Sequence, residues 1–127
     1  MILVDSSVWI DFLRGNTATA TRLAKAAENE RLAVSGYILH EVLRGCRTQA
    51  QFDRYQREMQ LWERVAEAEA DFVRSAQLYA KLRWSGVTVP ASDCLIAATA
   101  LRLNWPLFTE DADFTHIPNL RLYQAPV

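Results

Sequence analysis

The chain has 127 residues, a length that suits one domain with a buried core, and half of its residues are hydrophobic. A formal net charge of −1 is unlike the polycationic class of nucleic-acid binders, and the two distant cysteines match no paired metal or redox spacing. No apolar run approaches the roughly 18 residues that a membrane span needs. We therefore expect a single domain over residues 1–127, in the cytoplasm and without a membrane partner.

Short apolar strands alternate with helices along the chain. A hydrophobic strand over 1–4 precedes a helix that Ser6 or Ser7 begins and that continues to 13. The pattern predicts further helices over 17–30, 37–44, 49–63, 68–83 and 91–104, and further strands over 32–35, 106–109 and 120–123. Strands joined through helices form parallel sheets that are covered on both faces. The predicted fold class is therefore α/β, a three-layer α/β/α arrangement around a mostly parallel sheet of four to five strands.

Two predicted strands are followed directly by acidic residues. Asp5 follows the first strand, and Asp111 and Asp113 follow the strand over 106–109. In open α/β sheets, ligands bind outside the carboxyl ends of the strands, so these positions are candidates for a site. Helix capping, worth about 1 kcal/mol, is the alternative for Asp5, and ordinary turn chemistry is the alternative for Asp111. Spacing alone leaves open whether Asp111 or Asp113 points into the site.

Two further acids lie on predicted helices. Asp93 opens a helix that is apolar nearly all round and therefore buried, and a buried ionised carboxylate needs a positive partner. A metal ion would supply that partner, and the helix dipole is the alternative. Glu41 lies beside an apolar stripe, where an ion pair with Arg44 three residues later is the alternative interpretation.

Gathering these carboxylates at one place is unfavourable by about 4 kcal/mol per pair at a separation of about 4 Å, with an effective dielectric constant near 20. A divalent cation offsets this repulsion, and sites made only of oxygen ligands suit Mg²⁺ or Mn²⁺. Such ions activate water and stabilise the charge of an in-line phosphodiester displacement. The acids therefore point towards metal-dependent hydrolysis of a phosphodiester.

Four segments carry a family resemblance: "LVDSSVWIDFLRG", "ILHEVLRG", "PASDCLIAATAL" and "LFTEDADF" occur in this order. Together they resemble PIN-domain ribonucleases, most closely the VapC-type toxins of type II toxin–antitoxin systems. The resemblance implies a PIN-like α/β/α fold and a metal-dependent endoribonuclease that uses Mg²⁺ or Mn²⁺. It also implies an RNA substrate, a homodimer, and a cognate antitoxin whose C-terminal segment occupies the active-site groove.

The resemblance also implies roles for individual residues. The acidic site comprises Asp5, Glu41, Asp93 and Asp111, with Asp113 as an auxiliary or alternative fourth acid, and with Ser7 and Thr109 as supporting hydroxyls beside the metals. We predict hydrolysis by a metal-activated water, without a covalent enzyme intermediate. The candidates for binding RNA phosphates are Arg14, Arg44, Arg83 and Arg102, which the sequence does not rank; Arg14 and Arg44 are the two that we predict to bind RNA.

Two other functional classes fit parts of the pattern. A receiver-like phosphoacceptor also places acids around Mg²⁺, but it needs a Lys after a late strand, and here Lys25 and Lys81 both lie in predicted helices. A non-catalytic α/β interaction module could use the four tryptophans as anchors. It would not explain why acids recur at the strand ends.

Overall fold

The computed structural model describes residues 1–124, so the last three residues of the predicted domain lie outside the described part. It contains four strands: β1 (Ile2–Val4), β2 (Leu32–Ser35), β3 (Glu63–Val65) and β4 (Leu107–Phe108). The helices are α1 (Ser6–Leu13), α2 (Thr17–Ala27), α3 (Gly36–Arg44), α4 (Gln49–Met59), α5 (Glu69–Trp84) and α6 (Ala91–Leu103), followed by a 3₁₀ helix, η1 (Ala112–His116).

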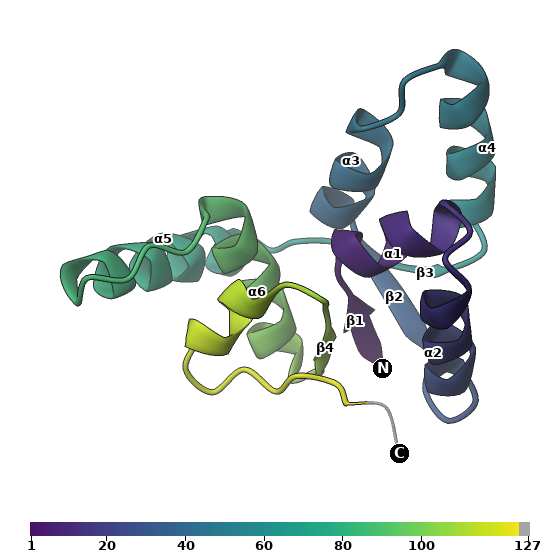
Figure 1. Cartoon of the computed structure of the whole chain (residues 1–127). Coiled ribbons are helices and arrows are strands. Elements are labelled where there is room, and N and C mark those ends of the chain that lie inside the picture. The colour runs from purple at the N-terminus through teal and green to yellow at the C-terminus, as the bar shows by residue number, and fades with distance from the viewer. Residues whose placement is uncertain (125–127) are drawn as a thin grey trace.

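The four strands form one parallel sheet in the order β3-β2-β1-β4. Two connections, through α1–α2 and through α3–α4, advance across the sheet in one direction, and the α5–α6 connection returns to place β4 on the other side of β1. Figure 1 shows α1 and α2 on one side of the sheet and α5 and α6 on the other, with α3 and α4 extending beyond it. The predicted three-layer α/β/α class is confirmed, with four strands.

The core lies on both faces of the central strands. Leu3, Val34 and Phe108 have no exposed surface, since parallel strands covered by helices on both faces are shielded from water. Helix α6 is buried continuously over residues 93–100, as its sequence predicts. Packing α6 so deeply fixes the position of Asp93 in its first turn.

Three predicted boundaries are wrong. The helix over 49–63 ends at Met59, and Glu63 instead opens the edge strand β3, whose charged residues carry no strand pattern of their own. Its pairing with β2 is a tertiary effect, supported by Trp62, whose ring lies 4.9 Å from that of Trp9. The helix over 17–30 ends at Ala27, and the strand over 120–123 is reduced to a single bridge between Leu122 and Leu107.

A buried polar contact joins α5 to α6. The carboxylate of Asp71, almost fully buried, accepts hydrogen bonds from Arg102 Nε at 2.8 Å and from Thr99 Oγ1 at 3.3 Å. It also accepts the Ala68 N–H at 2.9 Å. Burial alone would raise the pKa of Asp71, but these donors hold that pKa below its usual value, so the carboxylate stays ionised.

Among the described helices, none combines the length and the apolar character that crossing a membrane requires.

Candidate metal centre

The carboxyl ends of β1 and β4 are neighbours, which brings the two strand-end acidic segments together. Asp5 takes the N-cap position of α1, yet its side chain makes no capping bond. Instead Asp5 Oδ2 accepts hydrogen bonds from Ser7 Oγ and from Thr109 Oγ1, each at 2.8 Å. The carboxylate is therefore held at the edge between β1 and β4, and the capping interpretation of its side chain is wrong.

Three of the predicted acids converge most closely. Carboxylate oxygens of Asp93, Asp111 and Asp113 all lie within 4.8 Å of one another. The two acids after β4 therefore both lie close to Asp93. Turn chemistry is present as well, because Asp111 Oδ1 accepts the Asp113 N–H at 2.9 Å.

Asp93 has the most strained electrostatic environment of the group. Its Oδ2 is buried and has no hydrogen-bond partner among the described residues. Burial raises the pKa of Asp93 to about 7, and the charges of Asp111, Asp5, Asp113 and Glu41 add to the increase. A buried oxygen without a donor, surrounded by like charges, is what a cation would relieve.

Glu41 completes the cluster from α3. Its carboxylate accepts a hydrogen bond from Ser6 Oγ at 3.2 Å and forms an ion pair with Arg44 at 3.4 Å. Burial raises the pKa of Glu41, and the nearby charge of Asp5 acts in the same direction. The ion pair between Glu41 and Arg44 is therefore present, and Glu41 also faces the other acids.

The donor set fits a hard divalent cation. The five acids supply only carboxylate oxygens, the ligand type that Mg²⁺ and Mn²⁺ prefer, and they come from four separate segments of the chain. Their mutual repulsion and the partnerless Asp93 oxygen are the features that such an ion would neutralise. The sequence prediction of an acidic cluster is thus matched by the geometry.

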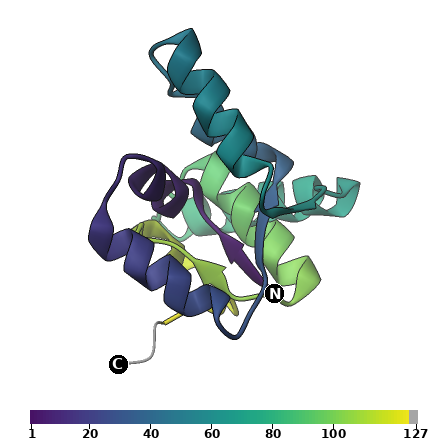
Figure 2. The same cartoon turned by 90° about the vertical axis from the view of Figure 1, so that its right-hand side faces the viewer.

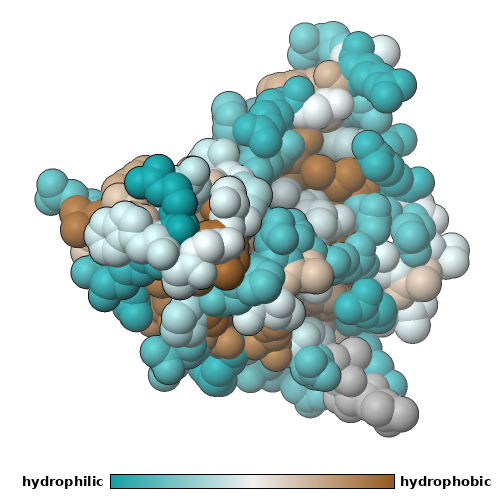
Figure 3. Space-filling view, turned by 60° about the vertical axis from the view of Figure 1, so that its left-hand side comes forward, coloured by the Kyte–Doolittle hydropathy of each residue, from teal (hydrophilic) through white to brown (hydrophobic). Residues whose placement is uncertain are grey.

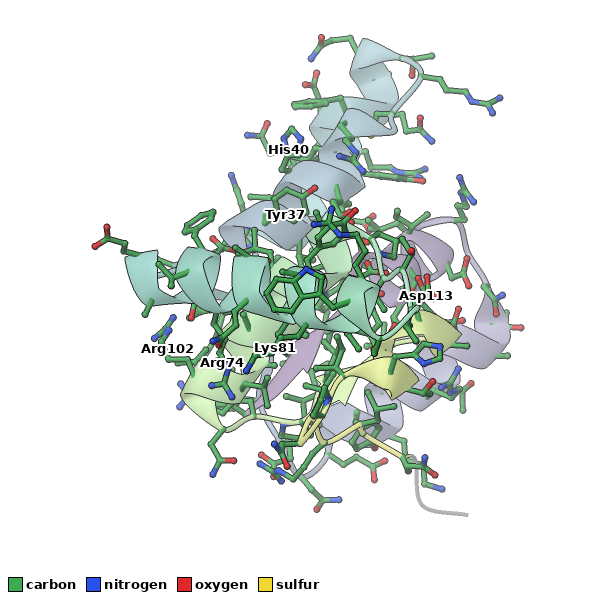
Figure 4. The ribbon with its side chains drawn as sticks, turned by 90° about the vertical axis from the view of Figure 1, so that its left-hand side faces the viewer. Tyr37, His40, Arg74, Lys81, Arg102 and Asp113 are labelled. Atoms are coloured by element: carbon green, nitrogen blue, oxygen red, sulfur yellow. The ribbon has the colours of Figure 1, made fainter. Side chains whose placement is uncertain are left out.

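The four candidate arginines differ in their surroundings. Arg14 is exposed at the end of α1, and Arg44 lies beside Glu41. Arg102 is engaged by Asp71, and Figure 4 shows it well apart from Asp113, so it is removed as a candidate for gripping phosphates at the acids. The guanidinium of Arg83 lies over the ring of Tyr79, 5.5 Å from its centroid.

Sequence reasoning missed two contacts around the acids. Ser6 was expected at most as a helix cap, but its hydroxyl binds Glu41. Glu110, between two predicted site residues, received no role, although its backbone N–H donates to Ser7 Oγ at 3.3 Å. Neither contact leaves a signal in a single sequence, because each depends on which loops the sheet places side by side.

Comparison with known proteins shows the family to which this chain belongs. The sequence profile of the PIN domain matches residues 2–120. Ribonuclease VapC11 of Mycobacterium tuberculosis and VapC ribonuclease Mb1587 of Mycobacterium bovis are each 32% identical to this chain over 130 residues, which cover 98% of this chain and 97% of the relative.

Solved structures show the same fold at lower identity. VapBC2 from Rickettsia felis, bound to a DNA fragment from its promoter, contains a chain that superposes with a TM-score of 0.81 at 22% identity, covering 97% of this chain and 98% of that one. VapBC-1 from nontypeable Haemophilus influenzae gives a TM-score of 0.79 at 22% identity, covering 98% of both chains. The arrangement of strands and helices is therefore shared with these solved structures.

Proposed function

This chain belongs to the PIN-domain family, and from that membership and its VapC relatives we propose that it is a metal-dependent endoribonuclease, the toxin of a toxin–antitoxin pair. The observation that supports the catalytic part is the buried oxygen of Asp93, which has no hydrogen-bond partner among the described residues and lies among four other carboxylates. Such a cluster has no structural benefit without a cation, since each carboxylate destabilises the others.

The proposal assigns the acids to the cation. Asp93, Asp111 and Asp113 form the tightest group, and Asp5 and Glu41 approach it from β1 and α3. Ser7 and Thr109 donate to one oxygen of Asp5, which fixes the orientation of that carboxylate and leaves its other oxygen available.

When bound, Mg²⁺ or Mn²⁺ supplies an activated water and neutralises charge on the phosphodiester. The chain's own residues hold and orient: the five acids are assigned to the cation and the two hydroxyls donate to Asp5, so the proposal assigns none of them to attack the phosphorus. Arg14 and Arg44 are the proposed phosphate ligands, because guanidinium groups match phosphate oxygens in geometry and charge. Hydrolysis of RNA is the reaction that this combination serves.

Metal-dependent cleavage is the direct test. Purified protein is incubated with a panel of structured RNAs in Mg²⁺, in Mn²⁺ or in EDTA, beside an Asp5→Ala variant. We expect cleavage only with metal, and a loss of at least about 100-fold in Asp5→Ala, since a ligand to the cation is removed. Cleavage that persists in EDTA, or that survives the substitution, would contradict the proposed site.

The proposed partners are a cognate antitoxin and a second copy of the chain. The solved relatives include a toxin–antitoxin complex from Klebsiella pneumoniae and VapBC structures from other bacteria, which supports an antitoxin partner. With RNA as substrate, the proposed place of action is the cytoplasm. Expression of this chain alone should arrest growth, and coexpression of the adjacent small reading frame should relieve the arrest. Unimpaired growth on expression of active, soluble chain would contradict the toxin role.

A further inference from the structure

Glu110 connects the acidic loop after β4 to helix α2. Its backbone lies within the 109–113 segment that carries Asp111 and Asp113, while its side chain points the other way, towards α2. There its Oε1 accepts hydrogen bonds from Arg22 Nη1 at 3.0 Å and from Thr19 Oγ1 at 3.3 Å. Figure 2 shows α2 alongside this C-terminal part of the fold.

Arg22 makes a second contact, with the residue directly before the 109–113 segment. Its guanidinium lies over the ring of Phe108, 5.0 Å from the centroid, in addition to the ion pair with Glu110. Phe108 and Glu110 flank Thr109, the residue whose hydroxyl binds Asp5. One arginine on α2 therefore holds both neighbours of a residue that contacts the site.

The backbone of the segment is tied to the site on its inner side. The Glu110 N–H donates to Ser7 Oγ at 3.3 Å, and the Asp111 N–H donates to Thr109 Oγ1 at 3.0 Å. Both hydroxyls donate in turn to Asp5. Glu110 is thus the point where the outer contacts with α2 and the inner contacts with Asp5 meet.

The 109–113 segment needs such an anchor because the other carboxylates repel the negative charges of its acids. Asp111 and Asp113 lie close to Asp93, which is fixed in place because α6 is buried over residues 93–100. Without a cation, repulsion is relieved most easily by outward movement of the segment that carries two of the three acids. An anchor on α2 resists that movement.

We propose that Arg22 and Glu110 are positioning residues that hold Asp111 and Asp113 in place for the cation and so set the affinity of the site for metal. This inference rests on the proposed metal centre, and it adds residues outside the acid cluster to it. Residues that orient metal ligands typically change metal affinity or activity by about 10- to 100-fold when removed.

The test is Mn²⁺ binding, measured by titration calorimetry on full-length protein free of partner. We expect Glu110→Ala and Arg22→Ala each to weaken binding about tenfold, and the double variant to be little weaker than either, because the two residues act through one contact. Glu110→Gln keeps an oxygen acceptor for both donors and should bind nearly as the wild type does. Circular dichroism and thermal melting establish that each variant is folded.

A matched control separates positioning from general loss of an ion pair. Arg31 pairs with Glu63 at the amino-terminal edge of the sheet, remote from the acids, so Arg31→Ala should leave Mn²⁺ affinity unchanged. A second readout is the Mn²⁺ dependence of RNA cleavage: the half-saturating concentration should rise about tenfold in Glu110→Ala, while the rate at saturation returns close to that of the wild type.

Three results would overturn the inference. Folded Glu110→Ala with unchanged Mn²⁺ affinity would show that the anchor does not act on the metal. An equal loss in Arg31→Ala would show that the effect is one of stability. Wild-type protein that binds no Mn²⁺ would overturn the proposed metal centre itself, and this dependent inference with it. The first two results, in a wild type that does bind Mn²⁺, would overturn the positioning inference alone.

Discussion

Asp93 combines a structural cost with a proposed functional role. It lies in the first turn of α6, where its buried Oδ2 has no donor among the described residues, and four other carboxylates raise its pKa further. Its pKa of about 7 lies well above the usual value of 3.8, so the folded chain binds a proton there that the unfolded chain has already released. Between those two pH values the metal-free protein therefore loses stability as the pH rises.

Replacement of this carboxylate should stabilise the metal-free protein. We expect Asp93→Asn to raise the free energy of unfolding at pH 8 by about 3 kcal/mol, because the ionised, buried group is gone. Near pH 4 the wild type is protonated at Asp93, so the difference should nearly vanish. Urea unfolding in EDTA at both pH values measures this. A variant that is less stable than the wild type at pH 8 would contradict the assigned environment.

Residues of the site were predictable to different degrees. Asp5, Asp111 and Asp113 follow strand ends and Asp93 lies at a helix start, which the sequence marks, whereas the grouping with Glu41 comes from the four motif segments. Ser6, Arg22 and Glu110 were not predictable, because their contacts join residues 35 to 103 positions apart and involve types that are common on any surface.

At the scale of elements, the buried contact between Asp71 and Arg102 attaches α5 to α6. Asp71 Oδ2 accepts from Ala68 N–H and Thr99 Oγ1, so an amide nitrogen at that place would face donors without an acceptor. We expect Asp71→Asn to destabilise the fold by about 2 kcal/mol, below the range for fully buried pairs because Arg102 is a third exposed. Thermal and urea unfolding at pH 7 measure the change.

The control for this prediction is Asp53→Asn. Asp53 lies on the exposed side of α4, where its carboxylate accepts a hydrogen bond from Gln49. This substitution should change the free energy of unfolding by less than about 0.5 kcal/mol. Because the folded-state pKa of Asp71 is depressed, its contribution is present above pH 3.8 and is lost as the pH falls through the lower, folded-state value. Equal stabilities of Asp71→Asn and the wild type at pH 7 would contradict the anchoring role.

Elements with strong periodicity were predicted well, and those made by pairing were not. Helix α6 is apolar on every side, and its burial follows directly. Strand β3 consists of Glu63, Arg64 and Val65, which favour helix as much as strand. Its conformation is decided by the backbone of β2 and by the packing of Trp62, and neither is visible in the local sequence.

At the scale of the whole molecule, α5 leaves apolar side chains in water. Val73 and Trp84 are 67% and 75% exposed, and their spacing of eleven residues places them on one face of the helix. Figure 3 shows hydrophobic surface, in brown, on the side of the molecule that carries α5. This face is the one through which we expect the proposed homodimer to form.

A charge on this face should separate the copies. We expect the wild type to have the mass of a dimer in light scattering after gel filtration, and Val73→Asp to have the mass of a monomer, because the carboxylate would be buried without a partner. Leu61, 81% exposed at the other side of the fold, provides the control: Leu61→Asp should remain dimeric. A dimeric Val73→Asp variant would exclude α5 as the contact.

The bond between Asp5 and Thr109 spans 104 positions of the chain, and it has a consequence for the time at which activity begins. During translation Asp5 is made long before Asp111 and Asp113, because the chain is built in the order of its sequence. Because β4 must pair beside β1 before Asp111 and Asp113 can join Asp5, a partly synthesised chain holds no complete cluster. For a proposed ribonuclease this delays activity until β4 and the segment after it have been made, so that the ribosome and the message are spared while the preceding residues are being joined.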